Sequence, residues 1–218
     1  MINRVIRYLV AYDFVLNFAF GLLSPIYAVY VLSKVGGNSL RVVGIAVACY
    51  WIARITTTVP LSRFMDHTDG ERDEFYFIIA GTAISATMPL LLIFADVPWH
   101  FYLIQFIHGL ANSMAVPGWR ILFTDHLDKG KTGYEWSMDD IGIGFAVGGS
   151  AYVGSLLADK FGFIPVLILL AGLGYMAAFI LIPLSQDFKS LRQLRLSRQL
   201  ANIRHRREHA MQSSHHVK

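Results

Sequence analysis

Charged residues are scarce in this sequence: they make up 16% of its 218 residues, against roughly a quarter in an ordinary soluble domain. So few charges cannot cover a water-soluble globule. Cysteine is nearly absent too, and the single Cys49 excludes an intrachain disulfide bond. The sequence has no nucleophile beside a base, no phosphate-binding glycine loop and no cluster of metal ligands. We therefore predict no enzymatic activity, catalytic residue, cofactor, metal or nucleic-acid partner.

Long apolar runs fill most of the chain, and 55% of its residues are hydrophobic. A helix of about 20 apolar residues crosses a bilayer core, whereas a transmembrane strand needs about ten residues of alternating polarity. The runs here are long and do not alternate. They cover residues 8–33, 40–62, 75–95, 99–123, 138–158 and 162–184. We predict an all-α integral membrane protein, with six transmembrane helices in residues 1–185 and a basic tail in residues 186–218.

Lysine and arginine are distributed unevenly, which predicts topology because basic loops stay in the cytoplasm. With the N-terminus inside, most of the 19 basic residues are cytoplasmic, and only Lys34, Arg41 and Lys160 lie outside. We predict that both termini are cytoplasmic in a cell inner or plasma membrane. Two roles stay open for the tail: attraction to anionic membrane lipids, or orientation of the helices alone.

A short pattern recurs at the ends of two predicted helices. Residues 61–66 (LSRFMD) and 154–159 (GSLLAD) each end in an aspartate that precedes a polar turn. If they mark a repeat, the first three helices match the last three. An odd number of helices inverts the second copy in the membrane. We therefore predict two inverted three-helix repeats, as in many secondary transporters.

Residues 105–120 carry the most specific pattern. Gln105, His108 and Gly109 are followed by Pro117, Arg120 and a glycine-rich run. This region resembles the Arg-x-x-Gln-Gly motif of the major facilitator superfamily, and the chain resembles the six-helix N-terminal half of one of its transporters. Gln105 replaces the arginine that is implicated in proton coupling in antiporters of that family. The resemblance therefore leaves the coupling ion open.

A second motif of the family, Gly-x-x-x-Asp-Arg-x-Gly-Arg, lies between its second and third helices and belongs to a gating surface. Residues 62–72 resemble this motif with one residue inserted, and residues 154–162 form a cleaner copy. The resemblance implies a gating role for Ser62, Asp66, Gly70, Arg72, Gly154 and Asp159.

Members of this family resemble two such halves in one chain, with the substrate bound between them at the midplane. A cavity needs a second wall, so we expect a homodimer with its two-fold axis along the membrane normal, or pairing with another transporter half. The resemblance implies a secondary transporter that moves a small solute by alternating access. The alternative is a non-transporting membrane scaffold whose basic tail binds lipids.

Polar residues follow one face of two predicted helices. Asp13 and Asn17 are four residues apart on the first, and Gln105, His108 and Asn112 share a face of the fourth. The resemblance places both helices along a substrate cavity, although such groups also bond helices together without a ligand. The candidate substrate-binding residues are Asp13, Asn17, Arg54, Gln105, His108 and Asn112.

Asp13 and Arg54 place ionisable groups inside predicted spans, where charge is costly. Three roles stay open for them: an ion pair that fixes helix packing, contact with a substrate or ion, or a lipid-facing position with the charge reaching the interface. Asp139 and Asp140 begin the predicted fifth helix and suit the positive end of its dipole. The alternative for Asp140 is a contact with Arg54.

Glycine and proline mark two further features. Gly144 and Gly148 form a Gly-x-x-x-Gly pair, which lets helices approach closely in lipid. We expect this helix-packing contact inside the chain, with a contact between subunits as the alternative. Pro25 and Pro117 are expected to kink the first and fourth helices.

Overall fold

The computed structural model describes residues 3–35, 40–67 and 71–186, and the regular structure in this part is helical. The predicted all-α fold is confirmed. Gly70 and the tail beyond Gln186 lie outside the described residues, so the predictions for them stay predictions. The elements in chain order are α1 (Arg4–Leu23), α2 (Tyr27–Val35), α3 (Leu40–His67), α4 (Arg72–Ile93), α5 (Pro98–Asp125), α6 (Thr132–Phe161), α7 (Phe163–Leu181) and the 3-10 turn η1 (Ile182–Gln186).

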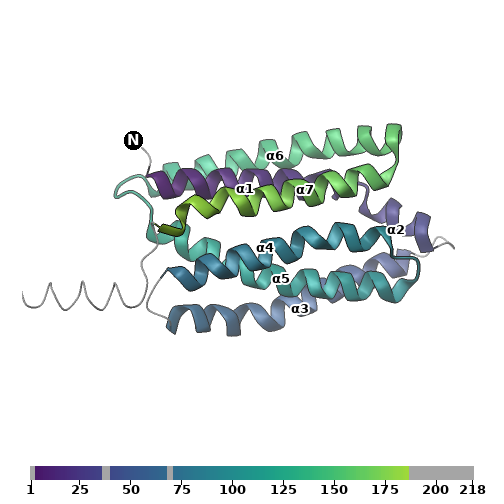
Figure 1. Ribbon diagram of the computed structural model, residues 1–218, viewed down its shortest axis with the longest axis horizontal. Coiled ribbons are helices and arrows are strands. Elements are labelled where there is room, and N and C mark those ends of the chain that lie inside the picture. The colour runs from purple at the N-terminus through teal and green to yellow at the C-terminus, as the bar shows by residue number, and fades with distance from the viewer. Residues whose placement is uncertain (1–2, 36–39, 68–70, 187–218) are drawn as a thin grey trace, which may run out of the picture.

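Five helices are long and apolar enough to cross a membrane: α1, α3, α4, α6 and α7 with its extension to Ser185. α5 is not among them, although its 28 residues equal the length of α3 and it lies alongside the others in the bundle (Figure 1). It carries polar side chains along its length, including Gln105, His108 and Asn112. The membrane-spanning bundle is established, while the count of six spans stays a prediction.

The first predicted helix is divided at Pro25. α1 ends at Leu23, a turn follows, and α2 begins at Tyr27. Proline lacks a backbone N–H and its ring clashes with the preceding turn, so the predicted interruption is confirmed here. α2 is held by the hydroxyl of Tyr30, which donates to the carbonyl of Leu92 near the end of α4 at 2.7 Å. In contrast, α5 continues through Pro117 without a break.

The helices form two closely packed pairs, and a third pair, α4 and α7, joins them. α3 packs along α5, and α1 packs along α6. α4 packs on α5 as α7 packs on α1, and α4 and α7 also pack on each other. This pattern is unchanged when α1, α3 and α4 are exchanged with α5, α6 and α7, as an inverted repeat would require. The repeat itself stays a prediction.

Glycines let both pairs approach closely. A methyl group on Gly109 of α5 would overlap the backbone carbonyl of Tyr50 in α3, and one on Gly21 of α1 would overlap the side chain of Ser150 in α6. These two contacts place the backbones of each pair nearer than larger residues permit. These two closely packed pairs carry most of the polar residues of the site described below.

The predicted Gly144 and Gly148 pair does not pack inside the chain. Both glycines are exposed on α6, and a methyl group on either would meet no atom within 4 Å. The internal contact is made further along the same helix, where Gly154 lies against the backbone carbonyl of Leu22. The expectation of internal packing at Gly144 and Gly148 is therefore wrong, and contact with another subunit stays a prediction.

α6 begins six residues before the start of the predicted span at 138, at Thr132. Asp139 and Asp140 consequently lie inside the helix, and the prediction that they cap it is wrong. The acidic residue of the first turn is Glu135, whose side chain accepts the backbone N–H of Asp128 at 3.0 Å. The two aspartates are thus free to take part in the site described below.

The two ends of the described chain lie at the same end of the bundle (Figure 1). This arrangement agrees with a single side for both termini. That this side is the cytoplasmic one stays a prediction from the bias of lysine and arginine.

Candidate functional site

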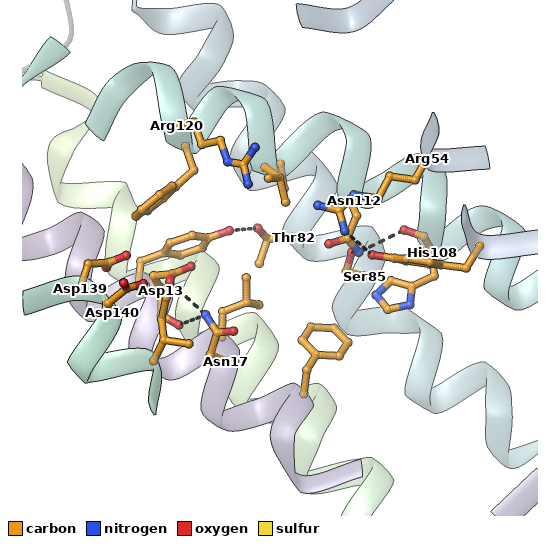
Figure 2. A pocket seen from close by; sticks show the side chains of 18 of the residues that line it. Asp13, Asn17, Arg54, Thr82, Ser85, His108, Asn112, Arg120, Asp139 and Asp140 are labelled. Atoms are coloured by element: carbon orange, nitrogen blue, oxygen red, sulfur yellow. Dashed lines mark hydrogen bonds between the residues drawn. The ribbon is translucent and has the colours of Figure 1, made fainter. Parts of the chain in front are cut away.

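A cavity of about 490 Å³ lies between the α1–α6 pair and the α3–α5 pair; α4 also contributes lining residues, and the lining includes charged and polar side chains (Figure 2). Binding sites for small molecules fall between about 300 and 1,000 Å³, so the volume suits a small solute. Asp13, Asn17, Arg54, His108 and Asn112 line this cavity, as the sequence pattern indicates. Their role in binding stays a prediction.

The α1–α6 side carries carboxylates. Asp13 accepts a hydrogen bond from the side-chain amide of Asn17 at 3.0 Å, one helical turn further along α1. Asp139 and Asp140 of α6 line the same part of the cavity (Figure 2). Asp139 is buried, and its Oδ1 has no hydrogen-bond partner. This end of the cavity therefore holds three carboxyl groups that protein donors only partly satisfy.

The α3–α5 side carries guanidinium groups. Arg54 donates from Nη1 to the hydroxyl of Tyr50 at 2.9 Å, and its guanidinium lies over the ring of Trp51, 5.2 Å from the ring centre. Such a cation–π contact stabilises the charge but supplies no anion. Arg120, more exposed and on α5, also lines the cavity. This side of the cavity therefore presents positive charge.

Asp13 and Arg54 form no ion pair with one another; they lie at opposite sides of the cavity (Figure 2). The interpretation that they pair and fix helix packing is wrong, because no ion pair joins them. Both line the cavity, and a lipid-facing position and contact with a substrate or ion both stay predictions. Asp140 shares the cavity with Arg54, but no ion pair joins them.

His108 closes the far end of the cavity. Its ring stacks on Phe20 of α1 at 5.1 Å and lies against Tyr50 at 5.2 Å between ring centres. Gln105 contacts the His108 ring, Oε1 to Nδ1, at 3.4 Å. Gln105 does not line the main cavity; it lines a smaller hollow of about 290 Å³ beyond His108. The predicted set is thus divided by an aromatic partition.

Asn112 projects into the cavity and donates to the backbone carbonyl of His108 at 3.2 Å and to the hydroxyl of Ser85 at 3.5 Å. The hydroxyls of Tyr12 and Thr82 are 2.6 Å apart and connect α1 with α4. Sequence reasoning did not select the α4 residues, because single serines and threonines are common in membrane helices. Only their position opposite the stripes of α1 and α5 marks them.

Two tryptophans also line the cavity. Trp119 of α5 is buried, and its indole N–H donates to the backbone carbonyl of Leu9 at 3.3 Å. Trp136 of α6 lies 6.0 Å from it, ring centre to ring centre. Tryptophan in a membrane protein is most readily interpreted as part of an interfacial belt, which is why the sequence does not reveal this pair.

The motif residues lie outside the main cavity. Ser62 and Asp66 of α3 share a hollow of about 210 Å³ with Arg54 and Arg120. Arg72 is exposed at the start of α4. On α6, Gly154 packs on α1, and Asp159 is exposed near the helix end. Their predicted gating role stays a prediction.

Comparison with known proteins agrees with this architecture. The sequence profile of the Major Facilitator Superfamily matches residues 11–207. No curated protein matches the sequence significantly. One similar solved structure is described as the in meso crystal structure of the POT family transporter PepTSo. It has a TM-score of 0.66 and 16% identity, and the match covers 87% of this chain and 39% of that one.

At this identity the likeness to the POT transporter shows a shared fold alone, and the chain spans well under half of that transporter's length. The family profile, in contrast, covers most of the chain, from α1 into the tail. The resemblance that the pattern at residues 105–120 indicates is thereby confirmed, and the chain belongs to the Major Facilitator Superfamily of membrane transporters.

Proposed function

We propose that this chain is one half of a secondary transporter, which moves a small polar solute across the membrane by alternating access around the central cavity. The supporting observation is that three carboxylates and two guanidiniums line one cavity within a bundle of membrane-spanning helices. Each such group is costly in hydrocarbon unless it meets water, a partner or a ligand. A polar binding site accounts for all of them. A non-transporting scaffold with a lipid-binding tail does not.

A second half is needed to cover the open side of the cavity. Only 17% of the spanning residues of α3 and of α6 are buried, against 39% to 44% in α1, α4 and α7. Large apolar side chains project from both helices, with Ile55 69% and Phe145 75% exposed. A charged cavity facing lipid directly would be strongly unfavourable. The proposed cover is a second copy of this chain, related by a two-fold axis along the membrane normal, or another transporter half.

Alternating access can be tested without knowing the substrate. Cys49 is the only cysteine, so Cys49→Ser gives a background in which Asn112→Cys places one thiol in the cavity. A membrane-impermeant maleimide is added to right-side-out and to inside-out vesicles. Because a transporter opens to each side in turn, we expect labelling from both sides. The matched control is Phe179→Cys on the exposed face of α7, which faces lipid and should be labelled from neither side.

Labelling of Asn112→Cys from one side only, or from neither, would contradict alternating access. Gel filtration of each variant confirms that it remains folded and monodisperse. Light scattering of the detergent-solubilised protein tests the second half: we expect a particle of two chains, or one in which this chain is joined by a second polypeptide. A particle that holds a single copy alone, while its cavity is labelled from both sides, would contradict the two-half arrangement.

A further inference from the structure

Acidic and basic side chains lie on opposite walls of the cavity. The carboxylates Asp13, Asp139 and Asp140 come from α1 and α6, and the guanidiniums of Arg54 and Arg120 come from α3 and α5. Since α1 packs on α6 and α3 packs on α5, each closely packed pair carries one sign of charge. Figure 2 shows the acidic groups at one end of the cavity and Arg54 at the other, with Arg120 between them.

The two walls do not neutralise each other. Among the described residues no ion pair joins any of these carboxylates to either arginine. Arg54 contacts the neutral Tyr50 hydroxyl and the Trp51 ring, and Asp13 contacts the neutral amide of Asn17. In a region of low dielectric, separated opposite charges are much less favourable than paired ones. The cavity therefore lacks a counter-charge on each side.

Asp139 is the acidic residue that most clearly lacks a partner in the protein. Only 3% of its surface is exposed, it lines the cavity, and its Oδ1 has no hydrogen-bond donor within reach. A buried carboxyl oxygen without a donor is rare in folded proteins and calls for a partner that the protein does not supply, such as a water, an ion or a ligand. An ammonium group supplies three N–H donors and the missing positive charge. On the opposite wall, a guanidinium suits a carboxylate or phosphate.

We propose that the transported solute carries a cationic amine and an anionic group, with the amine held by Asp139 and its acidic neighbours and the anion by Arg54. This inference rests on the proposed function, because it takes the cavity to be the solute site. Asp139 and Arg54 lie on opposite walls of the cavity with no ion pair between them, which favours a solute whose two charged groups are several bonds apart over one with both on adjacent atoms.

The test uses ω-amino acids of two to six carbons as probes, each compared with the alkylamine and the carboxylate of the same length. Binding to the full chain in detergent is measured by calorimetry, and quenching of Trp119 and Trp136, which line the cavity, locates it. We expect at least one amino acid to bind tenfold more tightly than both of its single-charge relatives. If no amino acid exceeds both relatives, the proposal is overturned.

Two variants that each remove one charge assign the charges to the walls. Asp139→Asn should remove the advantage of the amino acid over the carboxylate, and Arg54→Gln its advantage over the amine. Each loss is expected to be at least tenfold, which equals about 1.4 kcal/mol. Asp125→Asn and Lys160→Gln remove one charge of each sign at exposed sites away from the cavity, and both should bind as the unmodified chain does. Equal weakening in all four variants would refute the assignment.

Failure of this inference is distinguishable from failure of the proposed function. If the cavity thiol is labelled from both sides but single-charge anions or cations bind as tightly as the amino acids, the chain transports a different class of solute. If amino acids bind with the expected dependence on Asp139 and Arg54 but the thiol is accessible from one side only, the site is a receptor site and transport fails.

Discussion

Two glycines on the same helix should respond oppositely to alanine. In α6, a methyl group on Gly154 would lie 2.7 Å from both the Cα and the carbonyl carbon of Leu22, whereas ordinary contacts begin at 3.4 Å. α1 would have to move away by at least about 0.7 Å, and its backbone cannot swing aside as a flexible side chain can. A methyl group on Gly148, six residues earlier, meets nothing within 4 Å.

The magnitudes follow from this contrast. Overpacking costs about 1 to 3 kcal/mol. Replacement of glycine by alanine inside a helix is worth about 0.5 to 1 kcal/mol and is common to both variants. Gly148→Ala should therefore be slightly more stable than the unmodified chain, and Gly154→Ala less stable than Gly148→Ala by about 1 to 3 kcal/mol. For a chain of this size the difference corresponds to about 2 to 12 °C in Tm.

Thermal unfolding of both variants in the same detergent, followed by circular dichroism, measures this difference. Equal midpoints for the two variants would refute the claim that Gly154 sets the distance between α1 and α6. Light scattering on Gly148→Ala adds a second readout. If the exposed glycines contact a second half, this variant should associate more weakly while the single chain keeps its stability. Unchanged association would exclude Gly148 from the interface.

Three further outcomes are expected. Arg54→Leu should abolish binding of the amino acid probes, yet leave Tm within a few degrees, because Arg54 has no ion-pair partner to lose; a large fall in Tm would show a structural role instead. Tyr12→Phe removes the 2.6 Å contact with the buried Thr82 and should lower unfolding free energy by about 1 to 3 kcal/mol in denaturant titrations; no loss would contradict that link. Tyr30→Phe frees α2 from the carbonyl of Leu92, so hydrogen exchange should increase in α2 and stay the same in α6.

Five of the six predicted spans correspond to helices long and apolar enough to cross a membrane, because the hydrophobic effect of the bilayer acts on each segment by itself. The helix bounds were less predictable. The sequence predicts a fifth span from 138, but α6 begins at Thr132, because Glu135 and Trp136 continue the helix beyond its apolar run. Hydropathy reports where a segment meets lipid, whereas a helix continues as long as its backbone hydrogen bonds and end contacts permit. Because α6 begins earlier than predicted, Asp139 and Asp140 lie within the helix, where they line the cavity, and not at its end.

The sequence could predict cavity-lining residues only where they share one face of a single helix. Asp13 and Asn17 are selected by helical periodicity, and the structure places both on the cavity wall. Pairing across helices was not predictable, because the sequence does not say which way each helix face is turned in the bundle, and the structure sets Asp13 and Arg54 on opposite walls. The same applies to the glycines of α6. Gly148 and Gly154 are alike in sequence, and only the course of α1 decides which one is covered.

The length of α6 affects how the protein meets bilayers of different composition. Its 30 residues extend for about 45 Å, while a hydrocarbon core is about 30 Å thick and a typical tilt of about 20° shortens the projection only slightly. More than two helical turns therefore stand among the lipid headgroups or in water. If the surrounding bilayer thins or thickens by a few ångströms, α6 still spans its hydrocarbon core, and only the position of the headgroup boundary along the helix changes. This tolerance belongs to α6: the 19 residues of α7 extend for only about 28 Å, so a thicker bilayer must adjust to α7 instead.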